Sequence, residues 1–424
     1  MQDIKFIIEN PERVKTGAKN KNIPCDVDKI VSLYEEWKVI NREIEQIKAT
    51  QNSSSQNIAK ASPEEKATLL KEMSALKEKS KALEEKIAPL EAEIDALASK
   101  VPNPTLDSTP VGKDESENQI VKKFSEPKSF SFTPKDHITL GKELDIIDLD
   151  RAARMSGARF YYLKNEGALL ELALIQFVMQ KLASKGFCAV VPPVLVKEPA
   201  MYATGFFPAD KNEIYEVNAD EDKLYLIGTS EVPLAMLHYD EILNDYDLPK
   251  RYCGFSPCFR REAGSYGKDT AGIIRVHQFN KVEMFSFTNP EKSEEEHEFM
   301  VSVEEEIFSD LGLPYQKILM CTGDMGVPAA KKYDLEAWIP TQEKYREVTS
   351  CSNCTDFQAR RGKMRFKDEN GGKAYVHTLN GTAIALPRAI VAILENYQNE
   401  DGTVTIPEVL RPYMGGVSKI EKKQ

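Results

Sequence analysis

The chain has little that would hold it in a membrane or mark it for an oxidising compartment. No uninterrupted apolar run approaches the roughly 18 residues that a transmembrane helix needs. The start, MQDIKFIIENPERVK, lacks the apolar core of a signal peptide. The cysteines number seven, an odd count that does not suit a disulfide framework. We therefore expect a soluble, cytoplasmic protein with reduced thiols and no membrane partner.

The sequence also lacks an excess of positive charge. The formal net charge is -11 at pH 7, so any contact with nucleic acid must come from local basic patches and not from a globally basic surface. The single CxxC, formed by Cys351 and Cys354, has no second pair at the spacing of a structural zinc site. We expect structural thiols there and not metal ligands.

What the first hundred residues do have is the pattern of a coiled coil. Apolar residues recur at alternating steps of three and four in two runs. The first run is Ile30, Leu33, Trp37, Ile40, Ile44 and Ile47; the second extends from Leu69 to Leu97. Between them lies the polar stretch QNSSSQNIAKASPEE, in which Ser62 and Pro63 are placed as N-cap and first helical residue. The pattern predicts two helices that fold back as an antiparallel hairpin, with a kink in the second at Pro89.

Two roles for this hairpin stay open. A coiled coil of unknown context is usually a dimerisation or spacer element. Charge favours a second role: residues 42–81 hold eight basic and six acidic residues, whereas residues 82–100 hold two basic and five acidic ones. The distal part is therefore the more cationic, as contact with phosphates requires. Lysines on the flanks of a coiled coil are usually just solvated, so this signal is weak.

The proline-rich stretch VPNPTLDSTPVGKDESENQ marks a domain boundary near residue 101. We predict an N-terminal domain at 1–100, a linker at 101–130 and a second domain at 131–424. In the second domain, strand-like and helix-like segments do not alternate as a doubly wound sheet requires, which predicts an α+β fold with a largely antiparallel sheet. Residues 168–184 are expected to form a long helix, and the acidic run at 291–306 a solvated helix face.

The segment FRREAGSYGKDTAGIIRVHQFNKVEMF, residues 259–285, predicts two strands joined by a glycine-rich loop. Arg260 and Glu262 are placed two apart on the first strand, and Phe279, Lys281 and Glu283 on the second, so each set faces one side. One face then presents cation, carboxylate and aromatic together. A cross-strand ion pair on a solvated face would produce the same pattern.

This segment resembles motif 2 of the class II aminoacyl-tRNA synthetases, and RVHQFNKVEMF is similar to the version found in the seryl-tRNA synthetases. Three further segments resemble that family, and they occur in the same order. GTSEVPLA (228–235) resembles its serine-binding segment, REVTSCSNCTDFQARR (346–361) resembles its metal and ATP segment, and NGTAIALPR (380–388) resembles motif 3. The helix and VVPP strand at 168–193 resemble motif 1, the dimer interface. With the hairpin, the resemblance covers nearly the whole chain.

The resemblance implies a class II catalytic domain, an antiparallel sheet flanked by helices, behind an N-terminal arm that binds tRNA. It implies that the chain activates L-serine with ATP, with Mg²⁺ as cofactor, and transfers serine from seryl-adenylate to the 3′ end of tRNA(Ser), and to tRNA(Sec) as well. It also implies a homodimer.

Site residues are implied in the same way. Arg260 and Arg388 are the catalytic pair. Arg260 holds the α-phosphate and the serine carboxylate, and Arg388 holds the γ-phosphate. Phe279 stacks on adenine. The serine set is Thr229, Ser230, Glu231, Arg260, Glu283, Asn380 and Thr382. The ATP set is Arg260, Arg261, Glu262, Arg275, Val276, Phe279, Glu347, Val348, Thr349, Ser350 and Arg388. The metal ligands are Glu347 and Ser350.

Two other functions are compatible with parts of this pattern. The first is a class II-like ligase that loads an amino acid onto a carrier protein, but such an enzyme has no need of a long arm. The second is a coiled-coil adaptor with a degenerate, non-catalytic domain. The presence of Arg260, Glu283, Glu347 and Arg388 together speaks against the adaptor.

Overall fold

The computed structural model describes residues 4–58, 62–218, 221–263, 271–368 and 370–422. The chain divides into two compact units, Met1–Pro104 and Thr105–Gln424. Each has its own apolar core, a small one around Ile7, Val27 and Ile30 in the first unit and a much larger one in the second. The segment predicted as a linker contains a strand of the second unit, β1 (Gln119–Phe124), which pairs with β11 (Tyr315–Leu319).

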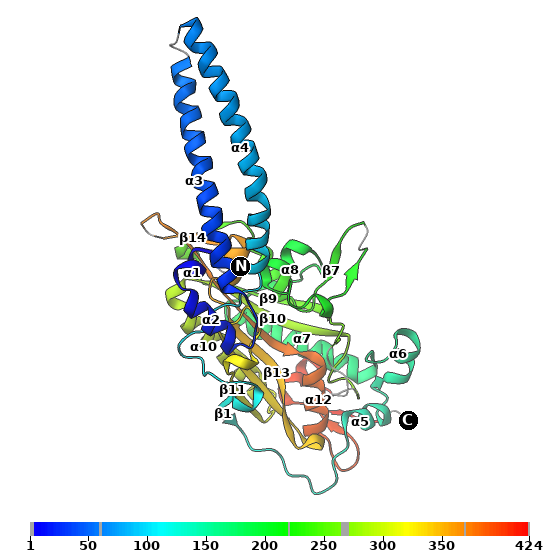
Figure 1. The fold of residues 1–424 in the computed structure, drawn as a ribbon. Helices are drawn as coiled ribbons and strands as arrows, with labels where there is room; N and C mark the ends of the chain where they lie inside the picture. The colour runs from blue at the N-terminus through cyan, green and yellow to red at the C-terminus, as the bar shows by residue number, and fades with distance from the viewer. Residues whose placement is uncertain (1–3, 59–61, 219–220, 264–270, 369, 423–424) are drawn as a thin grey trace. The chain divides into compact units, whose positions relative to one another are not determined.

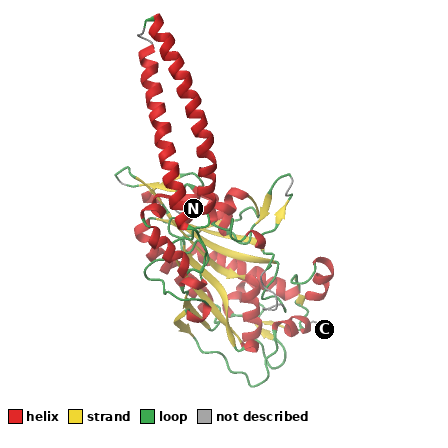
Figure 2. Cartoon of the chain, in the orientation of Figure 1, coloured by secondary structure: helices red, strands yellow, loops and turns green. Residues whose placement is uncertain are grey.

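The first unit is helical, and two long helices dominate it (Figures 1 and 2). Its elements are α1 (Ile4–Glu9), α2 (Pro11–Asn20), α3 (Val27–Ile58) and α4 (Pro63–Ala98). The predicted seam is buried between α3 and α4 at Ile30, Leu33, Ile44, Ile47, Ile87 and Ile94. Lys29 pairs with Glu93 at 3.5 Å, and Lys48 pairs with Glu84 at 3.1 Å. The residue number of the partner falls along α4 as the number rises along α3, so the two helices are antiparallel. The predicted hairpin is confirmed.

The ends of the hairpin helices differ in part from the prediction. Most of the polar stretch predicted as a turn continues α3 as far as Ile58, because nothing in QNSSSQN breaks a helix that already propagates. Residues 59–61 lie outside the described part. Ser62 is the N-cap of α4, as predicted, and its backbone N–H donates to the Glu65 carboxylate at 3.0 Å, as in a capping box. The 36 residues of α4, Pro89 included, extend roughly 54 Å at 1.5 Å per residue.

The second unit is built on an eight-stranded sheet in the order β1-β11-β12-β13-β16-β10-β9-β4. All neighbours are antiparallel except β4, which runs parallel to β9. Besides β1 and β11, the strands are β12 (Lys331–Ile339), β13 (Lys344–Asn353), β16 (His377–Ala385), β10 (Gln278–Thr288), β9 (Lys250–Phe259) and β4 (Cys188–Val190). The α+β fold with a largely antiparallel sheet is confirmed.

The second unit also contains smaller sheets and eight α-helices among its described residues. The sheets are β5 (Leu195–Lys197), β7 (Leu224–Leu226) and β6 (Glu216–Val217); β15 (Lys373–Tyr375), β14 (Arg365–Lys367) and β8 (Ile242–Asn244); β2 (Ile147–Asp148) with β3 (Tyr162–Leu163); and β17 (Val404–Thr405) with β18 (Lys419–Ile420). The helices are α5 (His137–Glu143), α6 (Leu149–Ser156), α7 (Asn165–Ser184), α8 (Glu198–Thr204), α9 (Glu231–Ala235), α10 (Ser293–Asp310), α11 (Phe357–Gly362) and α12 (Leu386–Asn396).

One glycine shows which face of the sheet is covered by α10. A Cβ added to Gly381 of β16 would lie 2.8 Å from a carboxylate oxygen of Glu304 in α10, so position 381 faces that helix. Because side chains alternate along a strand, Asn380 and Thr382 face the other side. The polar side chains of β16 are therefore presented on the face away from α10.

The prediction that the acidic run at 291–306 is a solvated face is wrong for three of its glutamates. Glu296, Glu304 and Glu305 of α10 are buried. Both oxygens of Glu296 accept from Arg251, at 2.7 and 2.6 Å, and Glu305 accepts from Lys317 at 3.0 Å. Cations on neighbouring strands offset the cost of burying Glu296 and Glu305, and Glu304 accepts from the Thr349 hydroxyl at 2.8 Å. A pattern of charges along one helix does not reveal such partners.

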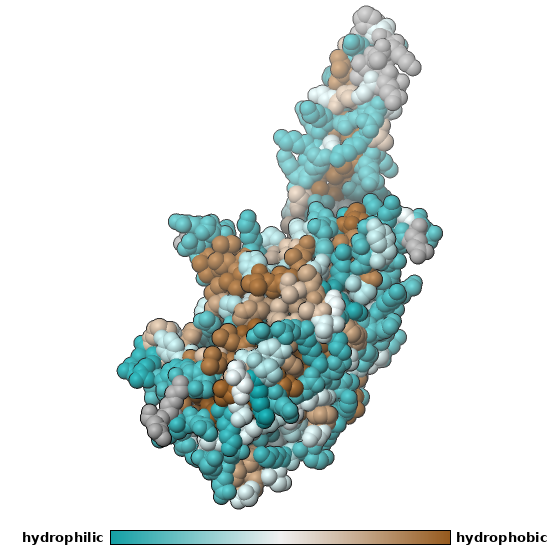
Figure 3. Space-filling view, turned by 180° about the vertical axis from the view of Figure 1, so that it is seen from behind, coloured by the Kyte–Doolittle hydropathy of each residue, from teal (hydrophilic) through white to brown (hydrophobic). Residues whose placement is uncertain are grey.

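Helix α7 qualifies the expectation about apolar runs. By length and composition alone, this helix would suffice to cross a membrane. Core helices pass the same test, and one side of α7 lies in the core through Leu170, Leu174 and Val178, all with 0% exposure. Its opposite side leaves Leu169 and Leu172 half exposed or more, at 50% and 61%. Figure 3 shows apolar side chains gathered on one face of this unit.

Candidate active site

Two adjoining cavities lie on the main sheet, one of about 180 Å³ and the other of about 290 Å³. Arg260, Lys281, Glu347 and Thr382 line both, so these side chains form the junction. The first cavity is further lined by Glu262, Ile274, Arg275, Val276, Phe279, Val348, Thr349 and Arg388. The second includes Thr229, Glu231, Glu283, Lys332, Ser350 and Asn380. Residues from four separate sequence motifs thus meet at one place.

The predicted strand that carries Arg260 and Glu262 ends too early to hold them. Strand β9 stops at Phe259 and β10 begins at Gln278. The chain leaves the ladder because the Arg261 N–H donates to the Glu213 carbonyl at 2.9 Å, and Glu262 has a φ of +51°. Arg260 and Glu262 nevertheless both line the first cavity. Residues 264–270 of the predicted loop lie outside the described part.

Arg388 is fixed at one end of the first cavity by motif 3 and its neighbours. It comes from the first turn of α12, and its Nη1 donates to the Glu347 carbonyl at 2.6 Å and to the Glu347 carboxylate at 3.2 Å. Its Nε donates to the Ile274 carbonyl at 3.3 Å. Desolvation opposes ionisation of Glu347, but Arg388 and Lys332 outweigh it and hold the pKa of that carboxyl well below its usual range. The pair presents a fixed guanidinium to the cavity.

The other wall of the first cavity combines an aromatic ring with two more charged groups. The guanidinium carbon of Arg260 lies 5.4 Å from the centre of the Phe279 ring, within the range of a cation–π contact. Arg260 Nε donates to the Gly228 carbonyl at 3.2 Å, and Arg275 pairs with Glu262 at 2.5 Å. A cavity lined by a flat ring and three arginines suits a planar, polyanionic ligand such as a nucleotide.

Among the carboxylates that line the second cavity, Glu231 and Glu283 have different partners. Burial, and next the nearby Glu283, raise the pKa of Glu231 to about 7. Gln358 donates to Glu231 at 2.7 Å. Glu283 instead pairs with Lys281 at 2.5 Å and accepts from the Thr382 hydroxyl at 3.2 Å. A small ligand that carries an ammonium and a hydroxyl finds a carboxylate for each in this cavity.

Some of the predicted residues do not present their side chains here. Ser230 is fully buried, and its hydroxyl is 2.6 Å from that of Ser256. Arg261 is exposed and lines neither cavity. The Thr349 hydroxyl donates to Glu304 at 2.8 Å, on the α10 side of the sheet. For these residues, adjacency in the sequence to a site residue is not the same as facing the site.

Sequence reasoning assigned no role to Lys281 or Gln358. Lys281 is 4% exposed and its Nζ lies between Glu283 and Thr382, 3.3 Å from the latter. The signal for Lys281 was present, since it shares a strand face with Glu283. Gln358 follows no pattern that a single sequence offers, because its contact with Glu231 joins residues 127 apart in the chain.

Glu347 and Ser350 were predicted as magnesium ligands, and their chemistry suits that ion. Glu347 lines both cavities and Ser350 lines the second. Among the residues that the structure describes, no cluster of three or more histidine, cysteine, aspartate or glutamate side chains could hold a metal. One carboxylate and one hydroxyl fit an ion that takes most of its ligands from phosphate oxygens and water, as Mg²⁺ does.

Comparison with known proteins agrees with this geometry along the whole chain. Residues 1–105 match the family model of the seryl-tRNA synthetase N-terminal domain, and residues 215–397 that of the tRNA synthetase class II core domain (G, H, P, S and T). The serine–tRNA ligases of Fervidobacterium nodosum and Dictyoglomus thermophilum are 45% and 46% identical to this chain. The first alignment covers 98% of both chains, and the second 100%.

Solved structures give the same result. The seryl-tRNA synthetase of Pyrococcus horikoshii, in a complex with ATP, superposes with a TM-score of 0.92 at 43% identity and covers 100% of both chains. The prolyl-tRNA synthetase of Giardia lamblia shares only the fold, with a TM-score of 0.57 at 16% identity over 65% of this chain and 55% of its own. The ordered motifs, the paired cavities and these likenesses place the chain in the seryl-tRNA synthetase family of class II aminoacyl-tRNA ligases.

Proposed function

We propose that this protein is a serine–tRNA ligase that makes seryl-adenylate from L-serine and ATP and then transfers serine to the 3′ end of tRNA(Ser). The observation that carries the proposal is the junction of the two cavities at Arg260 and Lys281. A nucleotide in the first cavity and an amino acid in the second would meet there, with their reacting groups beside a guanidinium. The relatives named as serine–tRNA ligases support the same assignment.

In the first step a serine carboxylate oxygen attacks the α-phosphorus of ATP, and the bond to diphosphate breaks with its electron pair. Two anions must meet, so the enzyme supplies positive charge and alignment more than proton transfer. Arg260 lies at the junction, where it would bind the α-phosphate and the serine carboxylate. Arg388, held by Glu347 and Ile274, would bind the γ-phosphate, and Phe279 would stack on adenine.

Serine would bind in the second cavity. Glu231, with Thr229 and Asn380 beside it, would bind the ammonium, and Glu283 with Thr382 the hydroxyl. Lys281 keeps Glu283 in an ion pair, which leaves Glu231 as the carboxylate for the ammonium. A site whose polar groups pair with a hydroxyl rejects alanine, because those groups are otherwise left unpaired.

Magnesium would be held by Glu347 and Ser350 when ATP is bound. The ion would neutralise charge on the phosphates, while the arginines of this chain orient the α-phosphate toward serine. The proposed ATP set is completed by four residues that are adjacent in the sequence to the members already named: Arg261, Val276, Val348 and Thr349.

For tRNA, we assign the arm formed by α3 and α4 as the binding element. Shape and backbone charge are the features by which proteins grip an RNA helix, and a long arm with a cationic distal part suits that use. Serine tRNAs would be selected through a long variable arm, and tRNA(Sec) would be a second substrate. We place the enzyme in the cytoplasm.

A homodimer is proposed through α7 and the strand that follows it. The exposed apolar residues of this region are Leu169, Leu172 and Val191, the last at 82% exposure. A side of a helix this apolar is normally covered in an assembled protein.

The experiment that tests the function is serine-dependent ATP–diphosphate exchange, measured with a panel of amino acids, followed by charging of bulk tRNA. Exchange with serine well above that with alanine or threonine, and charging that depends on serine, are expected. Exchange without any charging would favour transfer to a carrier protein instead, and the absence of both would favour an adaptor.

A further inference from the structure

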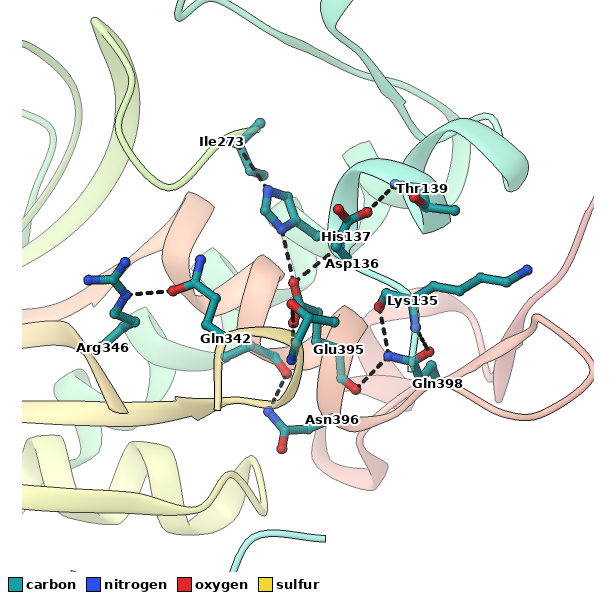
Figure 4. Close-up of polar contacts among 12 residues, drawn as sticks. Lys135, Asp136, His137, Thr139, Ile273, Gln342, Arg346, Glu395, Asn396 and Gln398 are labelled. Carbon is teal, nitrogen blue, oxygen red and sulfur yellow. Dashed lines mark hydrogen bonds and ion pairs between the residues drawn. The ribbon is translucent and has the colours of Figure 1, made fainter. Parts of the chain in front are cut away.

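A buried imidazole links the motif 3 helix to the end of the motif 2 loop. His137, the first residue of α5, is 4% exposed. Its Nδ1 lies 3.0 Å from Oε1 of Glu395 in α12, and its Nε2 accepts from the Ile273 backbone N–H at 3.3 Å (Figure 4). Because Nε2 is the acceptor, the ring hydrogen is on Nδ1, where it donates to Glu395.

The position of this imidazole is fixed by the protein alone. Glu395, at 1% exposure, accepts four hydrogen bonds, from the backbone N–H and Nδ1 of His137 at 3.1 and 3.0 Å and from the N–H and hydroxyl of Thr341 at 3.2 and 2.6 Å. Gln398, just beyond the end of α12, binds the residue two before His137. Its amide oxygen accepts from the Lys135 N–H at 2.8 Å, and its amide nitrogen donates to the Lys135 carbonyl at 2.9 Å. With four hydrogen bonds on one buried carboxylate and Lys135 held as well, the ring presents Nε2 in one place.

The returning loop lies directly against that ring. Gly272 has a φ of +71°, and a Cβ at this position would lie 1.9 Å from Nε2 of His137. No side chain fits in that space, and the backbone conformation is one that glycine adopts without strain. The close approach brings the Ile273 N–H to the imidazole.

Helix α12 therefore holds two consecutive residues of the chain as it re-enters the site. Glu395 acts on Ile273 through His137, and Arg388, two turns earlier on the same side of the helix, donates to the Ile274 carbonyl at 3.3 Å. Ile274, Arg275 and Val276 then line the first cavity. If Arg388 turns toward a phosphate, its hydrogen bond to the Ile274 carbonyl weakens. Of these two contacts from α12, the one from Glu395 through His137 to Ile273 then remains.

We propose that His137 is a positioning residue for the nucleotide: held by Glu395, it fixes the re-entry of the motif 2 loop at Ile273, and so sets residues 274–276 as a wall of the ATP pocket before ATP arrives. The inference rests on the proposed function. It assigns to His137 a role in binding ATP but none in binding serine, because the hydrogen-bond partners of His137 in the described part of the chain, Glu395 and Ile273, do not line the serine cavity.

The test compares two substitutions of His137, each of which keeps one of its two ring hydrogen bonds, to Glu395 or to Ile273. In His137→Asn the amide nitrogen replaces Nδ1 and can still donate to Glu395, but nothing reaches Ile273. In His137→Gln the amide oxygen reaches the place of Nε2 and can accept from Ile273. We expect the asparagine variant to raise the KM for ATP about tenfold, with the KM for serine within about twofold of wild type. The glutamine variant should restore the KM for ATP to within about threefold of wild type.

Direct titration with ATP alone separates this inference from the proposed function, since it needs no amino acid and no turnover. A weaker affinity for ATP in His137→Asn, recovered in His137→Gln, supports the link whichever amino acid is activated. Wild-type ATP affinity in His137→Asn, or equal rises in the KM values for ATP and serine, would overturn it. If His137→Asn does not fold, Gly272→Ala displaces the same contact from the loop side, and an unchanged ATP affinity in that variant would overturn the inference as well.

Discussion

At the scale of single residues, the site depends on guanidinium groups whose geometry is as important as their charge. Arg388 donates through Nη1 and Nε to two different backbone carbonyls, of Glu347 and Ile274. Lysine at this position keeps the charge but can neither hold both contacts nor offer a planar fork to phosphate. The same holds for Arg260, which is fixed through Nε on the Gly228 carbonyl.

Arg260→Lys and Arg388→Lys are therefore each expected to lower the rate of serine adenylation at least about tenfold, or about 1.4 kcal/mol of transition-state stabilisation. The measurement is kcat/KM in ATP–diphosphate exchange. Arg154→Lys is the matched control, because Arg154 is exposed, lines neither cavity and belongs to none of the proposed binding sets. Near-native exchange in both test variants would contradict the assigned roles.

Thr382 tests the hydroxyl site. Its Oγ1 lies 3.2 Å from Glu283 and 3.3 Å from Lys281. Thr382→Val keeps the shape and removes the hydroxyl, so serine activation should fall while alanine activation changes little. The preference for serine should narrow by roughly 1 to 3 kcal/mol. An unchanged ratio of kcat/KM for the two amino acids would show that Thr382 does not take part in selection.

Glu231 predicts how serine binding depends on pH. Its pKa is raised to about 7, chiefly by burial and next by Glu283, so below that pH the carboxyl is largely neutral. The serine ammonium favours the ionised form, and a proton must leave before serine binds. The KM for serine should therefore rise as the pH falls from about 8 to about 6. Glu231→Gln should bind serine weakly with little pH dependence in that window, and a wild-type KM that is flat with pH would contradict the assignment.

At the scale of elements, α7 has two different sides. One side packs in the core through Leu170 and Leu174, and the other leaves Leu172 61% exposed. The hydrophobic pattern alone favoured a long helix and did not separate the two sides, which is why the same helix also meets the length and hydropathy of a membrane span. Packing against the rest of the unit decides which side is left for a partner.

Leu172→Glu is expected to shift the proposed dimer toward monomer, because a charge placed in an apolar interface is desolvated without a partner. Sedimentation velocity over a range of protein concentrations measures the shift. Val111→Glu is the matched control, since Val111 is also exposed, at 71%, but is not part of α7. A variant that stays as dimeric as the control would remove α7 from the proposed interface.

At the scale of the whole molecule, the residues proposed for adenylation and the arm proposed for tRNA binding lie in different units of the chain. The residues proposed for adenylation all lie within Thr105–Gln424, and the arm lies within Met1–Pro104. Each unit has its own core, so the loss of the arm should leave the second unit folded.

Replacement of residues 31–97 by a short glycine linker should thus leave serine-dependent ATP–diphosphate exchange nearly intact. Charging of tRNA should collapse through a higher KM for tRNA, and in the intact enzyme tRNA binding should weaken as salt rises. A truncated, still dimeric protein that charged tRNA with unchanged efficiency would make the arm a spacer. Dimer content is checked first, so that loss of assembly is not taken for loss of tRNA binding.

The sequence by itself determined the features whose cause is local or periodic. The three-and-four spacing of apolar residues specified α3 and α4, since a seam at that period can be buried only between paired helices. Ser62 and Pro63 specified where α4 begins. The ordered motifs indicated the family, and the site residues that they implied line the two cavities, except Ser230 and Arg261.

Only the tertiary structure decided which neighbours along the chain face the site and which groups hold them. Strand β9 ends at Phe259 because Arg261 bonds to the distant Glu213 carbonyl. Glu296, Glu304 and Glu305 are buried because cations and hydroxyls on other elements meet them. His137, Glu395 and Ile273 come together from three segments far apart in the sequence. Each of these depends on contacts between distant residues, and such contacts leave no periodic pattern in the sequence.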